Sequence, residues 1–272
     1  MQLSFKFVDK SFRPANAAIY RLSIQISLNG FSFCVFDTVK NKHVVLKHYI
    51  YTKNILQDWC DEIAEILADI RDIDSKTPAV CLYVTRKNVI IPPEILDEKT
   101  IKQHLSFWFD IEEEEEIHTR RIQEIDASIC YLIPSWLITK LHTRFSNLKF
   151  LNQTCHHIRQ ICNDPNDTKM KLVFCGNFID LTVFKDNALM FNNTFTYSSI
   201  VDAAYFLVAV AKKIDTLQAP LHVSGDVSIA EIDELNRCFP NMQQNHDKKM
   251  TLRLGKETSS RFYNILLLNE CE

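Results

Sequence analysis

The segment Leu22-Ser23-Ile24-Gln25-Ile26-Ser27-Leu28-Asn29-Gly30-Phe31-Ser32-Phe33-Cys34-Val35-Phe36-Asp37 holds two runs in which apolar and polar residues alternate. Asn29-Gly30 stands between the runs, and a third apolar run, Val44 to Tyr51, follows a polar turn. Asn-Gly between alternating runs is the strongest short-range signal for a β-hairpin, because both residues tolerate the backbone that the tight turn needs. The segment therefore predicts three consecutive antiparallel strands.

The same order of elements occurs twice along the chain. After the first three strands, Asn54 and Gln57 form a capping box that opens a helix, and the apolar run 79–84 predicts a buried strand. The second half predicts, in order, strands at 170–175, 178–184 and 188–195, a helix capped by Ser198 or Ser199, and a strand at 221–224. The repeated β-β-β-α-β order predicts two lobes of one α/β architecture.

The polar, turn-forming segment Asn163–Asp167 is the most linker-like part of the chain. We therefore expect an N-terminal arm over 1–20, a first lobe over 21–165 and a second lobe over 166–272. Within these lobes the pattern also predicts a helix at 97–109, paired strands at 117–124 and 128–133, and a closing strand pair at 252–254 and 262–268.

Composition excludes several classes of protein. The chain has 272 residues, 46% of them hydrophobic, and a formal net charge of −3, so it has no bulk attraction to nucleic acid or to anionic lipid. The longest apolar run, 203–211, is too short to span a bilayer, and the first residues do not form a secretory signal. The nine cysteines include no CxxC pair. We expect a reduced, cytoplasmic protein that neither binds nucleic acid nor inserts into membranes.

A duplicated β-β-β-α-β unit resembles the ribonuclease H-like fold, and two copies in tandem resemble the actin-like ATPase fold of actin, the sugar kinases, the heat-shock ATPases and the pilus protein PilM. Tyr20-Arg21-Leu22-Ser23-Ile24-Gln25-Ile26-Ser27 with Asn29-Gly30-Phe31-Ser32-Phe33-Cys34, and the tail Cys271-Glu272, resemble more specifically an uncharacterised bacterial domain-of-unknown-function family with an actin-like fold. This resemblance implies the fold and leaves the function open.

The resemblance also implies where a nucleotide would lie. In actin-like ATPases the first hairpin of each lobe cradles phosphate between the lobes, an acid there holds Mg²⁺ through water, and a glycine-rich turn receives the adenosine. The matching positions in this sequence, taken in chain order, are Asn29, Gly30, Gly176, Asn177, Gly225 and Asp226. Ser27 or a neighbour stands where the first acid is usual, and the second hairpin has no acid either. Asp226 would repel phosphate from the following helix N-terminus.

Two main interpretations follow. The first is a non-catalytic actin-like interaction or scaffold module with a degenerate nucleotide cleft, an unknown protein partner, and no catalytic residues, metal or cofactor; a homo-oligomer stays open. The second is an ATP-binding actin-like ATPase whose Mg²⁺ is held by Asp37, Asp180 or Asp226. A nuclease of the ribonuclease H type would need several carboxylates that converge on two metal ions, and the first three strands offer only Asp37.

Other segments carry weaker signals. Cys155-His156-His157 with Cys162 lacks the paired spacing of a structural zinc site, so we expect a mixture of core and surface positions. The aromatic run Phe107-Trp108-Phe109 is expected in the core, although exposure would mark an interface. The acidic run Glu112–Glu116 favours a solvated loop, with a docking patch for a basic partner as the alternative.

Overall fold

The computed structural model describes residues 2–28, 30–52, 59–70, 73–97 and 99–270. The chain forms two compact units, one made of Met1–Gln153 with Ile265–Glu272 and the other of Thr154–Asn264. Each unit is built around its own β-sheet, and an additional three-stranded sheet belongs to the first unit.

The sheet of the first unit has the strand order β1-β4-β3-β2-β5-β9. Its strands are β1 (Gln2–Val8), β2 (Tyr20–Ser27), β3 (Gly30–Asp37), β4 (Lys42–Ile50), β5 (Ala79–Tyr83) and β9 (Leu148–Asn152). The predicted meander is confirmed: β2 and β3 pair antiparallel as far as Ser27 opposite Gly30. Asn29 and the predicted capping box of Asn54 and Gln57 lie outside the described residues.

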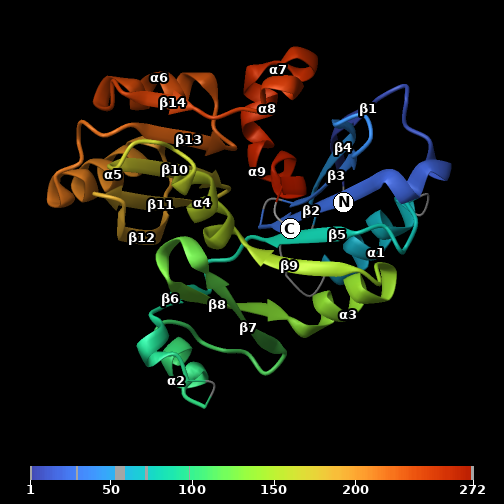
Figure 1. Cartoon of the computed structure of the whole chain (residues 1–272), viewed down its shortest axis with the longest axis horizontal. Helices are drawn as coiled ribbons and strands as arrows, with labels where there is room; N and C mark the ends of the chain where they lie inside the picture. The colour runs from blue at the N-terminus through green and yellow to red at the C-terminus, as the bar shows by residue number, and fades with distance from the viewer. Residues whose placement is uncertain (1, 29, 53–58, 71–72, 98, 271–272) are drawn as a thin grey trace. The chain divides into compact units, whose positions relative to one another are not determined.

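The sheet of the second unit has the order β12-β11-β10-β13-β14, which Figure 1 shows from bottom to top. Its strands are β10 (Lys169–Cys175), β11 (Phe178–Lys185), β12 (Ala188–Thr196), β13 (Leu221–Gly225) and β14 (Met242–Gln244). This order equals β4-β3-β2-β5-β9 of the first unit. A register shift also falls at the same position of the second strand in the two units, between Val35 and Phe36 of β3 and between Val183 and Phe184 of β11. The predicted duplication is therefore confirmed.

Helices cover these sheets because their apolar residues recur at helical spacing. They are α1 (Trp59–Asp69), α3 (Ser135–Arg144), α4 (Gln153–Cys162), α5 (Ile200–Ile214) and α6 (Ile229–Cys238). In the second unit, Leu207 of α5 and Leu235 of α6 share one core cluster with Leu172 of β10. Both helices begin with a complete capping box, Ser199 with Asp202 and Ser228 with Glu231. The structure thereby confirms the predicted cap of α5 and assigns it to Ser199.

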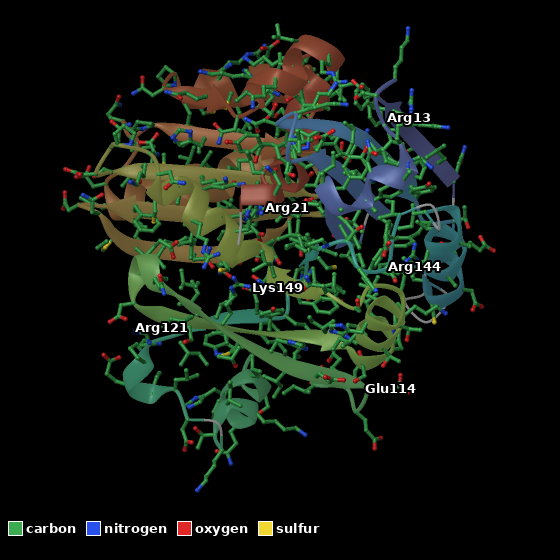
Figure 2. The ribbon with its side chains drawn as sticks, turned by 45° about the vertical axis from the view of Figure 1, so that its right-hand side comes forward. Arg13, Arg21, Glu114, Arg121, Arg144 and Lys149 are labelled. Atoms are coloured by element: carbon green, nitrogen blue, oxygen red, sulfur yellow. The ribbon has the colours of Figure 1, made fainter. Side chains whose placement is uncertain are left out.

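The three-stranded sheet has the order β6-β8-β7, with β6 (Asn88–Ile91), β7 (Glu115–Ile122) and β8 (Ala127–Pro134). The predicted pairing of β7 with β8 is confirmed. Figure 2 shows Glu114, the residue before β7, and Arg121, near the other end of the strand. Helix α2 (Ile101–Ser106) is shorter than predicted, and it places Leu105 in a small core against β6 and β8.

The core prediction for the aromatic run is wrong at two of three positions. Phe107 is 82% exposed and Trp108 is 72% exposed, whereas Phe109 packs against the core of the three-stranded sheet. The reason is the early end of α2 at Ser106, after which only Phe109 returns to the sheet.

The predicted C-terminal strand pair is also wrong, because the segment is helical. It forms α7 (Lys248–Leu254), α8 (Lys256–Arg261), α9 (Tyr263–Leu266) and a 3-10 turn, η5 (Leu268–Glu270). The carboxylate of Asp247 accepts a hydrogen bond of 2.6 Å from the Met250 amide and caps α7. Short apolar runs such as these are compatible with a strand or with a helix, so the sequence pattern alone does not separate the two.

Shorter 3-10 segments complete the chain: η1 (Pro14–Ile19), η3 (Pro93–Ile95) and η4 (Gln123–Ile125). The last of the described residues return to the first unit. Leu268 is fully buried there, η5 packs against β2 and β5, and the Arg21 guanidinium donates a hydrogen bond of 3.3 Å to the carbonyl of Asn269. The N-terminal segment is likewise part of this unit, because β1 pairs with the outer edge of β4.

Candidate functional site

The first hairpin takes its form from packing within its own sheet. A Cβ atom added to Gly30 would lie 2.0 Å from the carbonyl oxygen of Tyr49 in β4, so only glycine fits there. Ser27, which stands at the position of the usual acid, is buried, and its hydroxyl lies 3.4 Å from the carbonyl of Gly30. The described part of this hairpin therefore presents a hydroxyl and a backbone, and no carboxylate, at the turn.

Asp37 is too far along β3 to replace that carboxylate. It ends the strand that Gly30 begins, and seven steps of roughly 3.4 Å separate the two residues, on the order of 24 Å. Its buried carboxylate accepts hydrogen bonds of 3.1 Å and 2.8 Å from the amides of Val39 and Lys40. Asp37 therefore shapes the turn between β3 and β4, at the opposite end of the strand.

The second hairpin has a similar two-residue turn. Gly176, with a φ of +74°, and Asn177 connect Cys175 to Phe178, which pair across the ladder. Cys175 occupies the place of Ser27, and burial together with the Asp180 carboxylate raises the pKa of its thiol well above the usual value. The thiol therefore stays neutral and supplies no charge for a magnesium ion.

Asp180 is the carboxylate close to this turn. Its side chain is 2% exposed, and the Thr194 hydroxyl donates to it a hydrogen bond of 2.6 Å. Asp180 lies inside β11 rather than at its end, and its side chain is on a buried face of the sheet.

Gly225 and Asp226 lie at the same end of the sheet as this hairpin, because Phe174 of β10 pairs with Gly225 of β13. A Cβ atom on Gly225 would lie 2.2 Å from the carbonyl oxygen of Phe174, so the neighbouring strand requires glycine here. The carboxylate of Asp226 forms an ion pair with Arg261, with an Nε–Oδ1 distance of 3.1 Å. The structure thus brings Gly176, Asn177, Gly225 and Asp226 together at the C-terminal ends of β10 and β13.

Helix α6 follows this turn, and its own side chains cap the amides of its first turn. The Ser228 hydroxyl accepts a hydrogen bond of 3.3 Å from the Glu231 amide, and the Glu231 carboxylate accepts one of 2.8 Å from the Ser228 amide. Two amides that a phosphate group would use are therefore taken, and a carboxylate stands beside them. This arrangement disfavours an anion at the start of α6.

A buried polar layer lies between α4 and the sheet of the second unit, and sequence reasoning missed it. Lys171 is fully buried, its ammonium donates to the Gln160 amide oxygen, and it lies 5.6 Å from the centre of the Tyr263 ring. His156 hydrogen-bonds the carbonyl of Asn264 at 3.0 Å, and His157 Nδ1 lies 3.6 Å from the Asp180 carboxylate.

Burial shifts the pKa values of Lys171, His156 and His157 in this layer toward their uncharged forms. Burial lowers the pKa of Lys171 to about 7. Burial and the Lys171 charge lower the pKa of His156 to about 3, and the pKa of His157 well below its usual value. Both imidazoles are therefore neutral near pH 7. Within the described residues, no three histidine, cysteine, aspartate or glutamate side chains converge as a metal site.

The sequence did carry a signal for this layer. Polar residues alternate with apolar ones along three strands of the second half, namely Lys169 and Lys171, Asp180 and Thr182, and His222 and Ser224. Register places Lys171 opposite Thr182 and His222, and Val173 opposite Asp180 and Ser224, so these side chains share one face. Cys155, His156 and His157 are all buried against it, whereas Cys162 is partly exposed.

The sequence profile of one protein family, described as a protein of unknown function (DUF3822), matches residues 9–246. The chain belongs to the DUF3822 family. No curated protein sequence matches this DUF3822 chain at a significant level. Among the helices of its described residues, none is long and apolar enough to cross a lipid bilayer.

Solved structures agree on the fold. A *Bacteroides thetaiotaomicron* protein with actin-like ATPase fold and unknown function is 19% identical, with a TM-score of 0.75 over 85% of this chain and 92% of that one. The PilM-PilN type IV pilus biogenesis complex contains a chain that is 10% identical, with a TM-score of 0.62 over 93% and 98%. The ethanolamine utilization protein EutJ from *Carboxydothermus hydrogenoformans* is 10% identical, with a TM-score of 0.51 over 95% and 92%. This DUF3822 protein therefore has the actin-like ATPase fold, with two ribonuclease H-like units.

Proposed function

We propose that this protein is a non-catalytic actin-like interaction or scaffold module. The observation that carries the proposal is the chemistry of the two hairpins, where Ser27 and Cys175 stand in place of an acid. Magnesium prefers hard oxygen ligands, usually carboxylates together with phosphate. Phosphoryl transfer depends on positioning and on charge neutralisation, so hairpins without acids remove most of what the protein supplies to that reaction.

The remaining predicted site residues support the same proposal. Gly30 and Gly225 are accounted for by contacts with neighbouring strands, and Asp226 by its ion pair with Arg261. The capping box of Ser228 and Glu231 occupies the helix N-terminus that would face a nucleotide. Each feature has a local structural cause that needs no ligand.

Titration of ATP·Mg²⁺ into the full chain tests the proposal. We expect no binding heat at micromolar protein concentration, and phosphate release no faster than in buffer alone. Binding of ATP·Mg²⁺ in the micromolar range, or hydrolysis above background, would contradict the proposal.

The competing function is an ATP binder, and Asp180 is the observation that favours it, because its carboxylate lies near the second hairpin. If this function holds, ATP·Mg²⁺ raises the thermal midpoint of the wild type. Asp180→Asn then loses that increase, whereas Asp233→Asn, on the exposed side of α6, keeps it. Absence of any ATP-dependent increase in the wild type decides for the scaffold.

A scaffold needs a partner, and we propose a protein in the cytoplasm rather than nucleic acid or a membrane. The net charge of −3 supports the exclusion of polyanions. The PilM neighbour is itself in a complex with a protein, PilN. Retention of the partner on immobilised full-length chain, unchanged by nuclease treatment, is the expected result, and loss of retention after nuclease would contradict it.

A further inference from the structure

The outer edge of β12 differs from every other sheet edge in the described part of the chain. Edge strands normally avoid pairing with other molecules by being short or by carrying charge or proline. β6 and β14 have four and three residues, and the longer edge strands carry charged side chains, Lys6 in β1, Lys149 in β9 and Arg121 in β7. β12 has nine residues, Ala188–Thr196, with neither charge nor proline.

In the first unit, the strand that corresponds to β12 has an antiparallel partner on its outer edge. β4 is the third strand of the first repeat, as β12 is of the second, and β1 covers its outer edge in antiparallel pairing. No strand of the described residues takes that place on β12. The single bulge in β12 lies near its start, so the stretch from Phe191 to Thr196 remains in regular register with β11.

Apolar side chains gather beside this edge, and the charged residues Lys185, Asp186 and Lys213 border them. Phe195 of β12 stacks on Phe191 at 6.1 Å and on Phe206 of α5 at 4.5 Å, and all three rings are partly exposed. Met190, 54% exposed, joins Phe191 and the end of α5 in lining a surface hollow of about 650 Å³. An added strand would find both backbone partners and apolar surface here.

Charge indicates that the occupant is a second copy of the chain. Lys213 lines the hollow, so it lies on the flank of α5 that faces the β12 edge. Asp202 lies eleven residues earlier, about three helical turns, and therefore on the same flank, where its carboxylate also accepts hydrogen bonds of 3.0 Å from the Ser198 and Ser199 amides. An antiparallel copy of α5 would set each Asp202 opposite the other Lys213. An uncharged edge strand can also pair with itself, because no like charges meet.

We propose that two copies of this protein pair through β12 about a twofold axis, forming one continuous antiparallel sheet with both α5 helices on the same face. The axis makes the contact isologous, so the assembly closes as a dimer. This inference goes beyond the scaffold function and holds whether or not nucleotide binds.

Sedimentation of the full chain between 1 and 100 µM tests the dimer. We expect a concentration-dependent shift from one chain mass to two. Asn193→Lys, at an exposed position in the middle of β12, brings like charges together near the axis and should abolish the shift. Gln243→Lys, on the opposite edge strand, carries the same charge change and should dimerise as the wild type does.

A second pair of variants keeps the proposal testable if Asn193→Lys does not fold. Lys213→Glu should raise the dimer dissociation constant about 5- to 10-fold, because two interfacial charge pairs become repulsive. Lys212→Glu, whose side chain does not line the hollow, should leave it unchanged. Hydrogen exchange at the amides of Asn192 and Thr194 should slow as concentration rises.

Three results would overturn the proposal. The first is a wild-type chain that stays monomeric at 100 µM. The second is assembly beyond two copies, which a closed twofold contact does not allow. The third is equal dimerisation of Asn193→Lys and Gln243→Lys, or of Lys213→Glu and Lys212→Glu.

Discussion

At the scale of single residues, the glycines show how a position predicted to bind a ligand can have a purely structural cause. Gly225 has a φ of +102° and Gly255 a φ of +85°, a region that other residues rarely adopt. They differ in their surroundings. The Cβ that Gly225 lacks would collide with the Phe174 backbone, whereas nothing lies within 4 Å of a Cβ on Gly255.

This contrast predicts two different effects on stability. Gly225→Ala should lower the free energy of unfolding by about 2–4 kcal/mol, because backbone strain and overpacking add. Gly255→Ala should lower it by about 1 kcal/mol, from strain alone. Urea denaturation of both variants measures the difference. Equal losses would show that the β10 backbone yields readily, and the packing explanation of Gly225 would fail.

At the scale of elements, the second sheet has two unlike faces. The face toward α5 and α6 is apolar, whereas the face toward α4 carries Lys171 and Asp180 and meets the two buried histidines of α4. Burial disfavours the charged form of an ionisable side chain and so shifts its pKa. The unfolded chain has no such restriction, so stability must change with pH.

The sign follows from the pKa of Lys171, which burial lowers from 10.5 to about 7. Between these values the unfolded chain binds the proton more tightly than the native chain, so stability rises with pH from about 7 to 10.5. Lys171→Met should remove this rise and be at least as stable as the wild type at pH 7. Lys212→Met, at an exposed position of α5, should keep it.

Urea midpoints at pH 7 and pH 9.5 compare the three chains directly. A wild-type curve that is flat over this range, or a Lys171→Met curve as steep as the wild type, would show that Lys171 is charged and solvated. The histidines act in a separate pH range. Burial lowers the pKa of His156 from 6.5 to about 3, so between these values the unfolded chain binds a proton that the native chain does not, and stability falls as the pH is lowered.

At the scale of the whole molecule, the C-terminal segment completes the first unit. Ile265–Glu272 is grouped with Met1–Gln153, and Leu268 is fully buried beside β2 and β5, far from it in sequence. The first unit therefore cannot finish its core until the end of the chain is available.

Leu268→Ala should accordingly destabilise the first unit by about 2–5 kcal/mol, because it leaves a cavity in that core. Leu252→Ala is the matched control: Leu252 is 91% exposed, and its loss should change stability by less than about 0.5 kcal/mol. Hydrogen exchange of β2 and β5 amides reports on the unit concerned. Unchanged exchange in Leu268→Ala would show that the segment is not part of the core.

Alternation, Asn-Gly or Gly-Asn turns and helix caps act over a few neighbouring residues. The duplicated meander, the cap of α5 and the absence of acids at the hairpins could therefore be predicted from the sequence. The folded structure was needed to show that Lys171 and Asp180 are buried, that Phe107 and Trp108 are exposed, and that Leu268 packs in the first unit. Those outcomes depend on which segments cover each face. Alternation along the strands places Lys171 and Asp180 on one face, but it does not show that α4 covers that face.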